Sequence, residues 1–367
     1  MGDAAHAKVF EACVLTHERI YSSAQDINLL SNRVQHLLKG RDMLDPRFYL
    51  ASISPHSWSP KVVVIFRDQD VAGIVYAKER KVAGIPTGLI FIDTVLDTLL
   101  SDDSLSREEL VEKALNRLFA NRRIHGLRLF IPPDRAEHRA VRSVIASKAF
   151  DASSAVINHH AFLRLPASYE LFLQQFGRHK RRNFRYYRRA FAAAGGEYTG
   201  EMTLEEFRLA ALRLGSKDVV GANAAGLDRA LCMLATARRP LLTGLRMNGE
   251  YVSVLGGWHE PDRTTVFVQL NDDRAHAKMS LSVVLRAYLI EELIGQEVPV
   301  LLFWAGVGEP YLAQSELVST ICVCIDRPSF FWRTIRRVIE NLVSWAPMPL
   351  ANHLRWIAPN APNQEAI

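Results

Sequence analysis

Hydrophobic residues recur at strand spacing in some segments and at helix spacing in others. The order of these predicted strands and helices occurs twice along the chain. Apolar, β-branched runs flank the polar residues 68–70 within the segment 62–80, which predicts a hairpin, and 88–93 predicts a third strand. Ser106 and Glu109 have the spacing of a capping box, so an amphipathic helix is expected after them. A strand at 126–134, a helix at 134–147 and a closing strand at 159–166 are predicted next.

The second part of the chain repeats this order. The segment 241–260 predicts a hairpin, because Asn248-Gly249 suits a tight two-residue turn. A third strand is expected at 264–272 and a helix at 279–294. Strands at 298–308 and 319–327 and an amphipathic helix at 329–345 complete the unit.

The repeated order predicts two similar domains and a fold class. We expect α/β (α+β) domains whose mixed, mostly antiparallel sheets are flanked by helices. Their predicted boundary lies near 166–168, which gives an N-terminal domain 1–166, a C-terminal domain 167–346 and a loose tail 347–367. The remaining expectations are a helix at 25–38, a loop at 45–60, one long helix at 168–194, a strand at 197–202, a helix at 203–214 and a loop at 215–227.

Length, composition and cysteine content narrow the class of protein. The 367 residues, of which 49% are hydrophobic and 23% charged, are typical of two folded domains. The four cysteines are too few and scattered for a disulfide framework, and Cys322 and Cys324 share one face of a strand, as buried thiols. We expect no metal site. The chain starts without a signal-peptide pattern and has no apolar run long enough to span a membrane, so a cytoplasmic protein is predicted.

A moderately basic charge points to an anionic ligand without choosing one. The formal net charge is +6, which suits a phosphate-bearing cofactor, RNA, or simply a basic surface. The segment RHKRRNFRYYRR (178–189) predicts an amphipathic helix with six arginines and an apolar aromatic stripe. Its cationic face is interpreted as a solvated surface, a phosphate site or an RNA contact.

The start of the predicted helix 279–294 is a candidate anion site. Almost every side of this helix is apolar, so it should be buried, but Lys278, Ser280 and Ser282 are small or basic. Free amides and the helix dipole can bind a phosphate there. The simpler interpretation is that one of the serines caps the helix.

Four segments in order resemble one enzyme family. They read GRHKRRNFRYYRRAFAAAGGEY, LLTGLRMNGEYVSVLGG, NDDRAHAKMSLSVVLRAYLIEELI and FWAGVGEPYL. Residues 168–312, about 40% of the chain, resemble the acetyltransferase family first associated with cellulose biosynthesis, a branch of the GNAT superfamily. Asp273 and Ser280 match that family's Asp and the start of its Ser-Pro-Gly motif.

The resemblance implies a tandem GNAT fold that binds acetyl-CoA or a longer acyl-CoA as co-substrate. The pantetheine arm would lie beside Val268, Gln269 and Leu270, and the pyrophosphate would meet Lys278, Ser280, Leu281 and Ser282. The acceptor, a small amine or alcohol, would lie near Asn183, Arg185, Asn271, Asp273 and Trp304. Alternation along the strand predicts that Phe267, Gln269 and Asn271 share one face.

The chain departs from the family pattern where chemistry is expected. Leu281 and Ser282 replace Pro-Gly, Trp304 replaces an aspartate, and Leu312 replaces a lysine. The acid and base roles are then assigned to Glu309, Tyr311 or His259, which are the catalytic candidates.

Three functions remain open. The first is acyl transfer from acyl-CoA to an amine or hydroxyl group. The second is a Fem-type peptidyltransferase, which has the same tandem halves but takes its acyl group from aminoacyl-tRNA, and which the cationic helix favours. The third is a non-catalytic binding module, which Trp304 and Leu312 favour.

Overall fold

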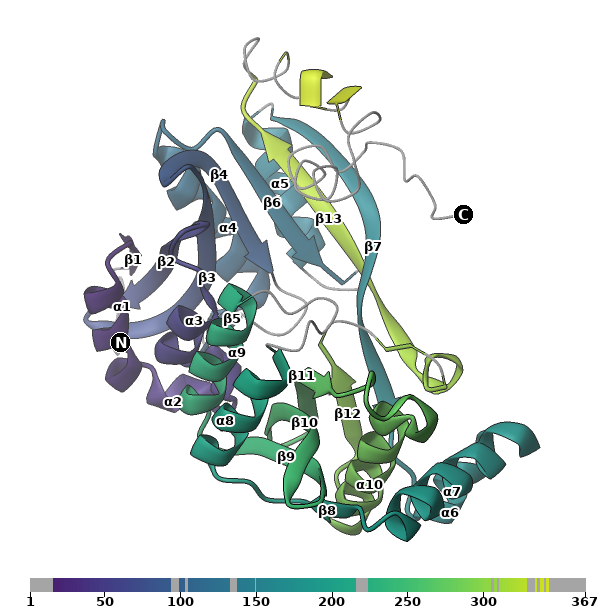
Figure 1. Cartoon of the computed structure of the whole chain (residues 1–367). Helices are drawn as coiled ribbons and strands as arrows, with labels where there is room; N and C mark the ends of the chain where they lie inside the picture. Colours follow the sequence, from purple (N-terminus) through teal and green to yellow (C-terminus); the bar gives the residue numbers. More distant parts are fainter. Residues whose placement is uncertain are drawn as a thin grey trace, which may run out of the picture.

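One continuous sheet of 13 strands organises the whole molecule (Figure 1). The computed structural model describes residues 16–93, 99–102, 105–132, 137–148, 150–215, 224–304, 307–308, 310–328, 334, 337–339 and 341–342. Within them the strand order is β1-β2-β3-β4-β6-β13-β7-β12-β11-β10-β9-β8, with β5 paired to β3. Only the β4–β6 and β11–β12 pairs are parallel. The predicted α/β class with mixed, mostly antiparallel strands is therefore confirmed.

The first half contains seven strands and five helices in the described residues, besides one short 3₁₀ turn. The strands are β1 (Thr16–Tyr21), β2 (Trp58–Arg67), β3 (Asp70–Val82), β4 (Ile85–Asp93), β5 (Leu99–Ser101), β6 (Gly126–Ile131) and β7 (Asp151–Arg164). The helical segments are α1 (Ala24–Arg33), α2 (Gln35–Leu38), η1 (Asp42–Leu44), α3 (Pro46–Ser52), α4 (Arg107–Ala120) and α5 (Glu137–Lys148). The predicted capping box at Ser106 and Glu109 is present at the start of α4.

The second half contains the predicted hairpin, third strand, helix and strand. Its strands are β8 (Glu197–Thr199), β9 (Pro240–Met247), β10 (Glu250–His259), β11 (Thr264–Asn271), β12 (Val300–Phe303) and β13 (Glu316–Asp326). Its helical segments are α6 (Tyr169–Gln174), α7 (Arg178–Ala193), α8 (Leu204–Gly215), α9 (Ala224–Thr236), η2 (Ala277–Met279), α10 (Leu281–Gly295) and η3 (Leu312–Gln314). Asn248 and Gly249 both have positive φ, as the predicted tight turn requires.

Three local predictions were wrong. The expected loop at 45–60 contains α3, because Asp45 caps the helix and Pro46 occupies its first turn. The expected single helix at 168–194 is two helices, because the chain turns between α6 and α7 and Gly177 is extended. The expected loop at 215–227 ends in the helix α9, while 216–223, the tail 347–367 and most of the predicted helix at 329–345 lie outside the described residues.

The two halves exchange their closing strands. The last strand, β13, lies between β6 and β7 of the first half, and β7 pairs at its other end with β12 of the second half. Figure 1 shows β7 and β13 running side by side from one half into the other. The predicted boundary at 166–168 remains a prediction, because the sheet continues through it.

A buried ion pair joins β6 to β13. Arg128 Nη1 lies 2.8 Å from Asp326 Oδ1, and both side chains are almost completely buried. A Cβ added at Gly126 would lie 2.3 Å from Asp326 Oδ1, so the carboxylate occupies the space that glycine leaves. Cys322 and Cys324 lie on the same face of β13, both buried, as predicted.

Removal of the Asp326 carboxylate should destabilise the fold strongly. Asp326→Ala removes the carboxylate that compensates the buried charge of Arg128, so we expect a loss of about 3–5 kcal/mol in the free energy of unfolding. Urea titration followed by circular dichroism measures this loss. The double variant Arg128→Met/Asp326→Leu should recover most of it, and equal stability of the two variants would contradict an essential pairing.

Candidate functional site

The sheet opens beside the second part of β11. β11 pairs with β12 only from Thr264 to Val266, and the Trp304 amide then donates to the Val266 carbonyl at 3.0 Å. On its other edge β11 remains paired with β10 as far as Asn271. Among the described residues no strand covers the β12-side edge of 267–271, so its backbone groups are available to a ligand.

A β-bulge in β11 changes which side chains face this opening. Gly256 pairs with Val268 and Gly257 with Val266, so Phe267 is the extra residue. The predicted common face of Phe267 with Gln269 and Asn271 was therefore wrong for Phe267, which packs 5.6 Å from Trp304 on the opposite face of the sheet.

Gln269 and Asn271 do share a face, in a short polar chain. Gln269 Nε2 donates to Asn271 Oδ1 at 3.2 Å, and the Ser253 hydroxyl donates to the same oxygen at 2.6 Å. Val268 and Leu270 pack instead toward α8 on the other face. The open edge therefore has a polar face toward α10 and an apolar face toward α8.

The start of α10 has the features of an anion site. Ser280 adopts a left-handed conformation (φ 47°) and its side chain makes no cap hydrogen bond. Its carbonyl accepts from Val283 N and Val284 N, whereas the amides of Leu281 and Ser282 have no partner among the described residues. No acid lies in the first turn. The amides and the helix dipole can therefore bind a phosphate.

The residues that replace Pro-Gly do not obstruct this helix end. The Leu281 side chain is fully buried in the core beneath α10, and Ser282 is half-buried. Lys278 is exposed in the preceding turn η2. These residues fit a phosphate-bearing donor.

A guanidinium lies between α10 and the open edge of β11. Arg286 Nε donates to Gln269 Oε1 at 2.7 Å, and the guanidinium lies 5.2 Å from the ring of Phe303 and 5.8 Å from that of Tyr311. No carboxylate pairs with it in the described part of the chain. Burial lowers the pKa of the Arg286 guanidinium, as expected for a cation without an acid beside it.

Tyr311 is the predicted catalytic residue that the structure brings to this cluster. Its side chain is buried among Phe176, Phe184 and Phe303, and its hydroxyl has no hydrogen-bond partner among the described residues. Burial raises the pKa of Tyr311 far above its usual value. The hydroxyl therefore stays protonated at neutral pH and can act only as a proton donor.

His259 lies away from the cluster that contains Arg286 and Tyr311. It ends β10 opposite Thr264, at the start of β11, and its Nδ1 lies 2.9 Å from the Thr264 hydroxyl. It lines a separate cavity of about 510 Å³, together with Gly200, Arg239 and Glu292. Burial, with a smaller effect of Arg239, lowers the pKa of His259, so its imidazole is neutral at pH 7. The structure does not bring His259 together with Tyr311.

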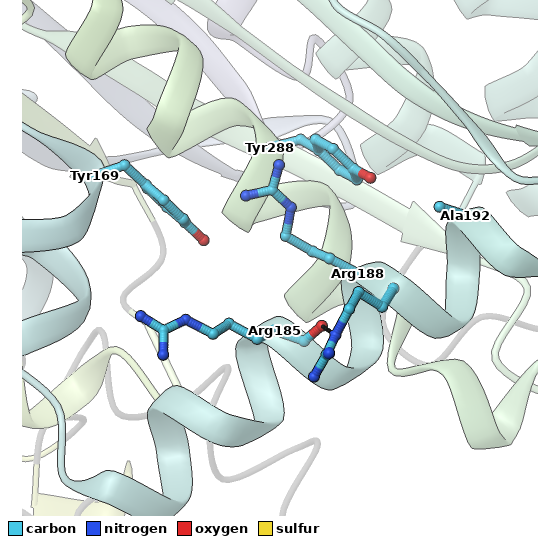
Figure 2. A pocket seen from close by; sticks show the side chains of 6 residues that line it. Tyr169, Arg185, Arg188, Ala192 and Tyr288 are labelled. Carbon is cyan, nitrogen blue, oxygen red and sulfur yellow. Dashed lines mark hydrogen bonds between the residues drawn. The ribbon is translucent and has the colours of Figure 1, made fainter.

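A second cavity, of about 610 Å³, lies between α6, α7 and α10. It is lined by Tyr169, Arg185, Arg188, Arg189, Ala192 and Tyr288. Figure 2 shows the Tyr169 hydroxyl between the guanidinium groups of Arg185 and Arg188. Two of these cations already have acid partners, Arg185 with Glu170 at 2.7 Å and Arg188 with Glu291 at 2.5 Å. The cavity combines arginine and aromatic side chains, and its charges are largely compensated.

The other predicted site residues do not form one cluster in the described part of the chain. Asn183 is half-buried on α7, and Asp273 is exposed in the turn after β11. Trp304 packs against Trp258 and His160 in an apolar cluster that both halves share. Glu309 lies outside the described residues.

Sequence reasoning missed Arg286 and Ser253. A signal for Arg286 was present, because it is the one basic residue of the otherwise apolar helix LSVVLRAYLIEELIG. A single cation in a buried helix needs a partner or a ligand. Ser253 gave no such signal, since only the register of β10 against β11 brings it to Asn271.

Comparisons with known proteins identify the fold. No family model and no curated protein matches the sequence. Among solved structures, the C-terminal domain (DUF2156) of a putative lysylphosphatidylglycerol synthetase from Agrobacterium fabrum is 11% identical, with a TM-score of 0.54 over 83% of this chain and 93% of that chain. FemX is 10% identical, with a TM-score of 0.53 over 83% and 96%. A tandem GNAT protein from the clavulanic acid biosynthesis pathway is 13% identical, with a TM-score of 0.47 over 85% and 100%.

These likenesses show architecture alone, because all identities are low. The chain has the overall fold of FemX and of this DUF2156 domain, which agrees with the tandem fold predicted from the sequence.

Removal of the Tyr311 hydroxyl should not cost stability. Tyr311→Phe deletes a buried group that has no partner in the described residues, so we expect stability to stay level or to rise by about 1 kcal/mol. Tyr76→Phe is the matched control, because the buried Tyr76 hydroxyl donates to the Leu44 carbonyl at 2.5 Å and its loss should cost about 1 kcal/mol. Thermal unfolding measures both, and a Tyr311→Phe loss equal to the control would show that the hydroxyl is structurally bound.

Proposed function

We propose that this protein transfers an acyl group from acyl-CoA to an amine or hydroxyl acceptor. The observation that carries the proposal is the open edge of β11 next to the unpartnered amides at the start of α10. An extended, amide-containing arm can pair with such an edge, and a phosphate suits such a helix end. The resemblance to the cellulose-biosynthesis branch supports the same donor, and we propose the cytoplasm as its location.

The residues then have distinct roles. The amides of Leu281 and Ser282, with Lys278 nearby, would bind the donor phosphates, and 268–270 would lie along its arm. When bound, the donor supplies a thioester carbonyl, which the acceptor nitrogen or oxygen attacks as the carbon–sulfur bond breaks. The acceptor's proton goes to a base, for which Glu309 remains the candidate, and the protonated Tyr311 hydroxyl would donate a hydrogen bond to the leaving thiolate. The carrier of the base role stays a proposal.

A negative charge at the start of α10 should separate binding from folding. Ser282→Glu places a carboxylate where phosphates would bind, so we expect the affinity for CoA to fall about tenfold or more. The same charge favours the helix dipole, so stability should be unchanged or rise by about 0.3–1 kcal/mol.

Leu204→Glu is the matched control, because Leu204 is exposed at the first position of α8. Isothermal titration with CoA should give wild-type affinity for this variant. Unchanged CoA affinity of the Ser282→Glu variant would contradict phosphate binding at the start of α10.

A second donor, aminoacyl-tRNA, is favoured by one observation on α7. Arg178, Arg181 and Arg182 have no acid partner among the described residues, and α7 contacts η2 at the start of α10. Three unpaired guanidinium groups therefore lie on the helix that borders the proposed donor site. Such a row suits the phosphates of a nucleic acid.

Salt dependence distinguishes the two donors. For tRNA, log affinity should fall steeply with log salt, by about 0.7 for each single-strand phosphate contacted. Arg178→Ala/Arg181→Ala/Arg182→Ala should then reduce the slope by about 2. For acyl-CoA the slope should be shallow and the triple variant should change it little. Binding of a donor without turnover for any acceptor would favour the non-catalytic module.

A further inference from the structure

We infer that Arg286 is the binding group for a substrate carboxylate next to the reacting thioester, so that the acyl group or the acceptor carries an acid. This inference rests on the proposed function, since it assigns a substrate class to the same site.

First, the positive charge of Arg286 has no counterion among the described residues. The guanidinium is half-buried on a helix whose other core-facing residues are apolar, and it has no acid partner in the described part of the chain. Its side-chain hydrogen bond to Gln269 uses Nε and leaves the two terminal nitrogens without an acceptor among the described residues. A buried cation without a counterion is costly, so a bound anion would compensate it.

The second step is the rigidity of this group. Gln269 accepts from Nε and donates in turn to Asn271, whose side-chain oxygen also accepts from Ser253. The rings of Phe303 and Tyr311 lie beside the guanidinium plane. The planar fork is therefore oriented before any ligand arrives, which favours a carboxylate that accepts two parallel hydrogen bonds.

The third step is position. Arg286 lies more than one turn into α10, about 7.5 Å along the helix axis from Leu281, where the donor phosphates are proposed. It faces Gln269 on the open edge of β11 and the end of β12 at Phe303. The buried Tyr311 hydroxyl, which also lacks a partner in the described residues, belongs to the same cluster. Because Arg286 faces the point where β12 ends and the opening begins, the anion would lie away from the donor's phosphates and toward its reacting end.

Two stable CoA derivatives that differ by one charge test whether the acyl group carries the acid. Carboxymethyl-CoA carries a carboxylate on the sulfur substituent, and carbamoylmethyl-CoA carries the neutral amide of the same shape. If the acyl group carries the acid, the wild-type protein should bind the first at least tenfold more tightly by isothermal titration. Arg286→Gln should abolish that preference, and Arg286→Lys should retain part of it.

Amino acids and their neutral amides test whether the acceptor carries the acid. In the presence of acetyl-CoA, an acid on the acceptor should appear as protection against thermal unfolding by one or more of the twenty amino acids and not by the corresponding amides. Arg286→Gln should lose this protection. Arg208→Gln, the same charge change at an exposed position of α8, is the control and should behave as wild type.

The outcomes separate this inference from the function on which it rests. Equal binding of both CoA probes, together with no preference for amino acids over amides, overturns the carboxylate site and leaves the donor site intact. If neither CoA probe binds, the proposed donor site is wrong, and the inference that depends on it is wrong as well. If Arg286→Gln reduces stability but preserves a charge preference, Arg286 only packs against the aromatic rings and the inference is overturned.

Discussion

The backbone hydrogen bonds of β13 hold the molecule together. This strand pairs with β6 on one side and with β7 on the other, while β7 pairs with β12. Each half thus obtains its last strand from the other, and neither can satisfy its sheet edges alone. The buried Arg128–Asp326 pair supports the register of this exchange at one end, where Asp326 lies opposite Gly126 and reaches diagonally to Arg128.

The exchange also determines the shape of the candidate site. β12 has four residues, and it is held by Ala161–Arg164 of β7 on one side and by Thr264–Val266 of β11 on the other. The opening begins where β12 ends, so the first half limits the width of a site whose chemistry lies in the second half. The apolar cluster around Trp258 and Trp304, which includes Met43 and Phe48 from the first half, supports the opposite face of the sheet.

Local structure was predictable from the sequence where a residue has a specific conformational task. Asn248 and Gly249 form the expected hairpin turn, and Ser106 with Glu109 forms the expected cap, because few other residues serve there. The exchange of strands was not predictable, because alternation shows which face of a strand is buried but not which strand lies beside it. The bulge at Phe267 needed the pairing of β10 with β11. For the candidate site, the helix start at Ser280 and the polar residues Gln269 and Asn271 were found from the sequence, whereas Arg286 was found only from its contacts.

The shared sheet has a consequence for synthesis of the protein. Residues 126–164 leave the ribosome long before 316–326, which must lie between β6 and β7. At ordinary elongation rates of about 5–20 residues per second, the two edges wait roughly 10–30 s for their partner. During that interval the nascent first half has exposed hydrogen-bonding edges, and chaperones that bind such edges would protect it from pairing with neighbouring chains. A ribosome that stalls before β13 therefore releases a chain in which the edges of β6 and β7 are unpaired. We expect cellular quality control to degrade such a chain.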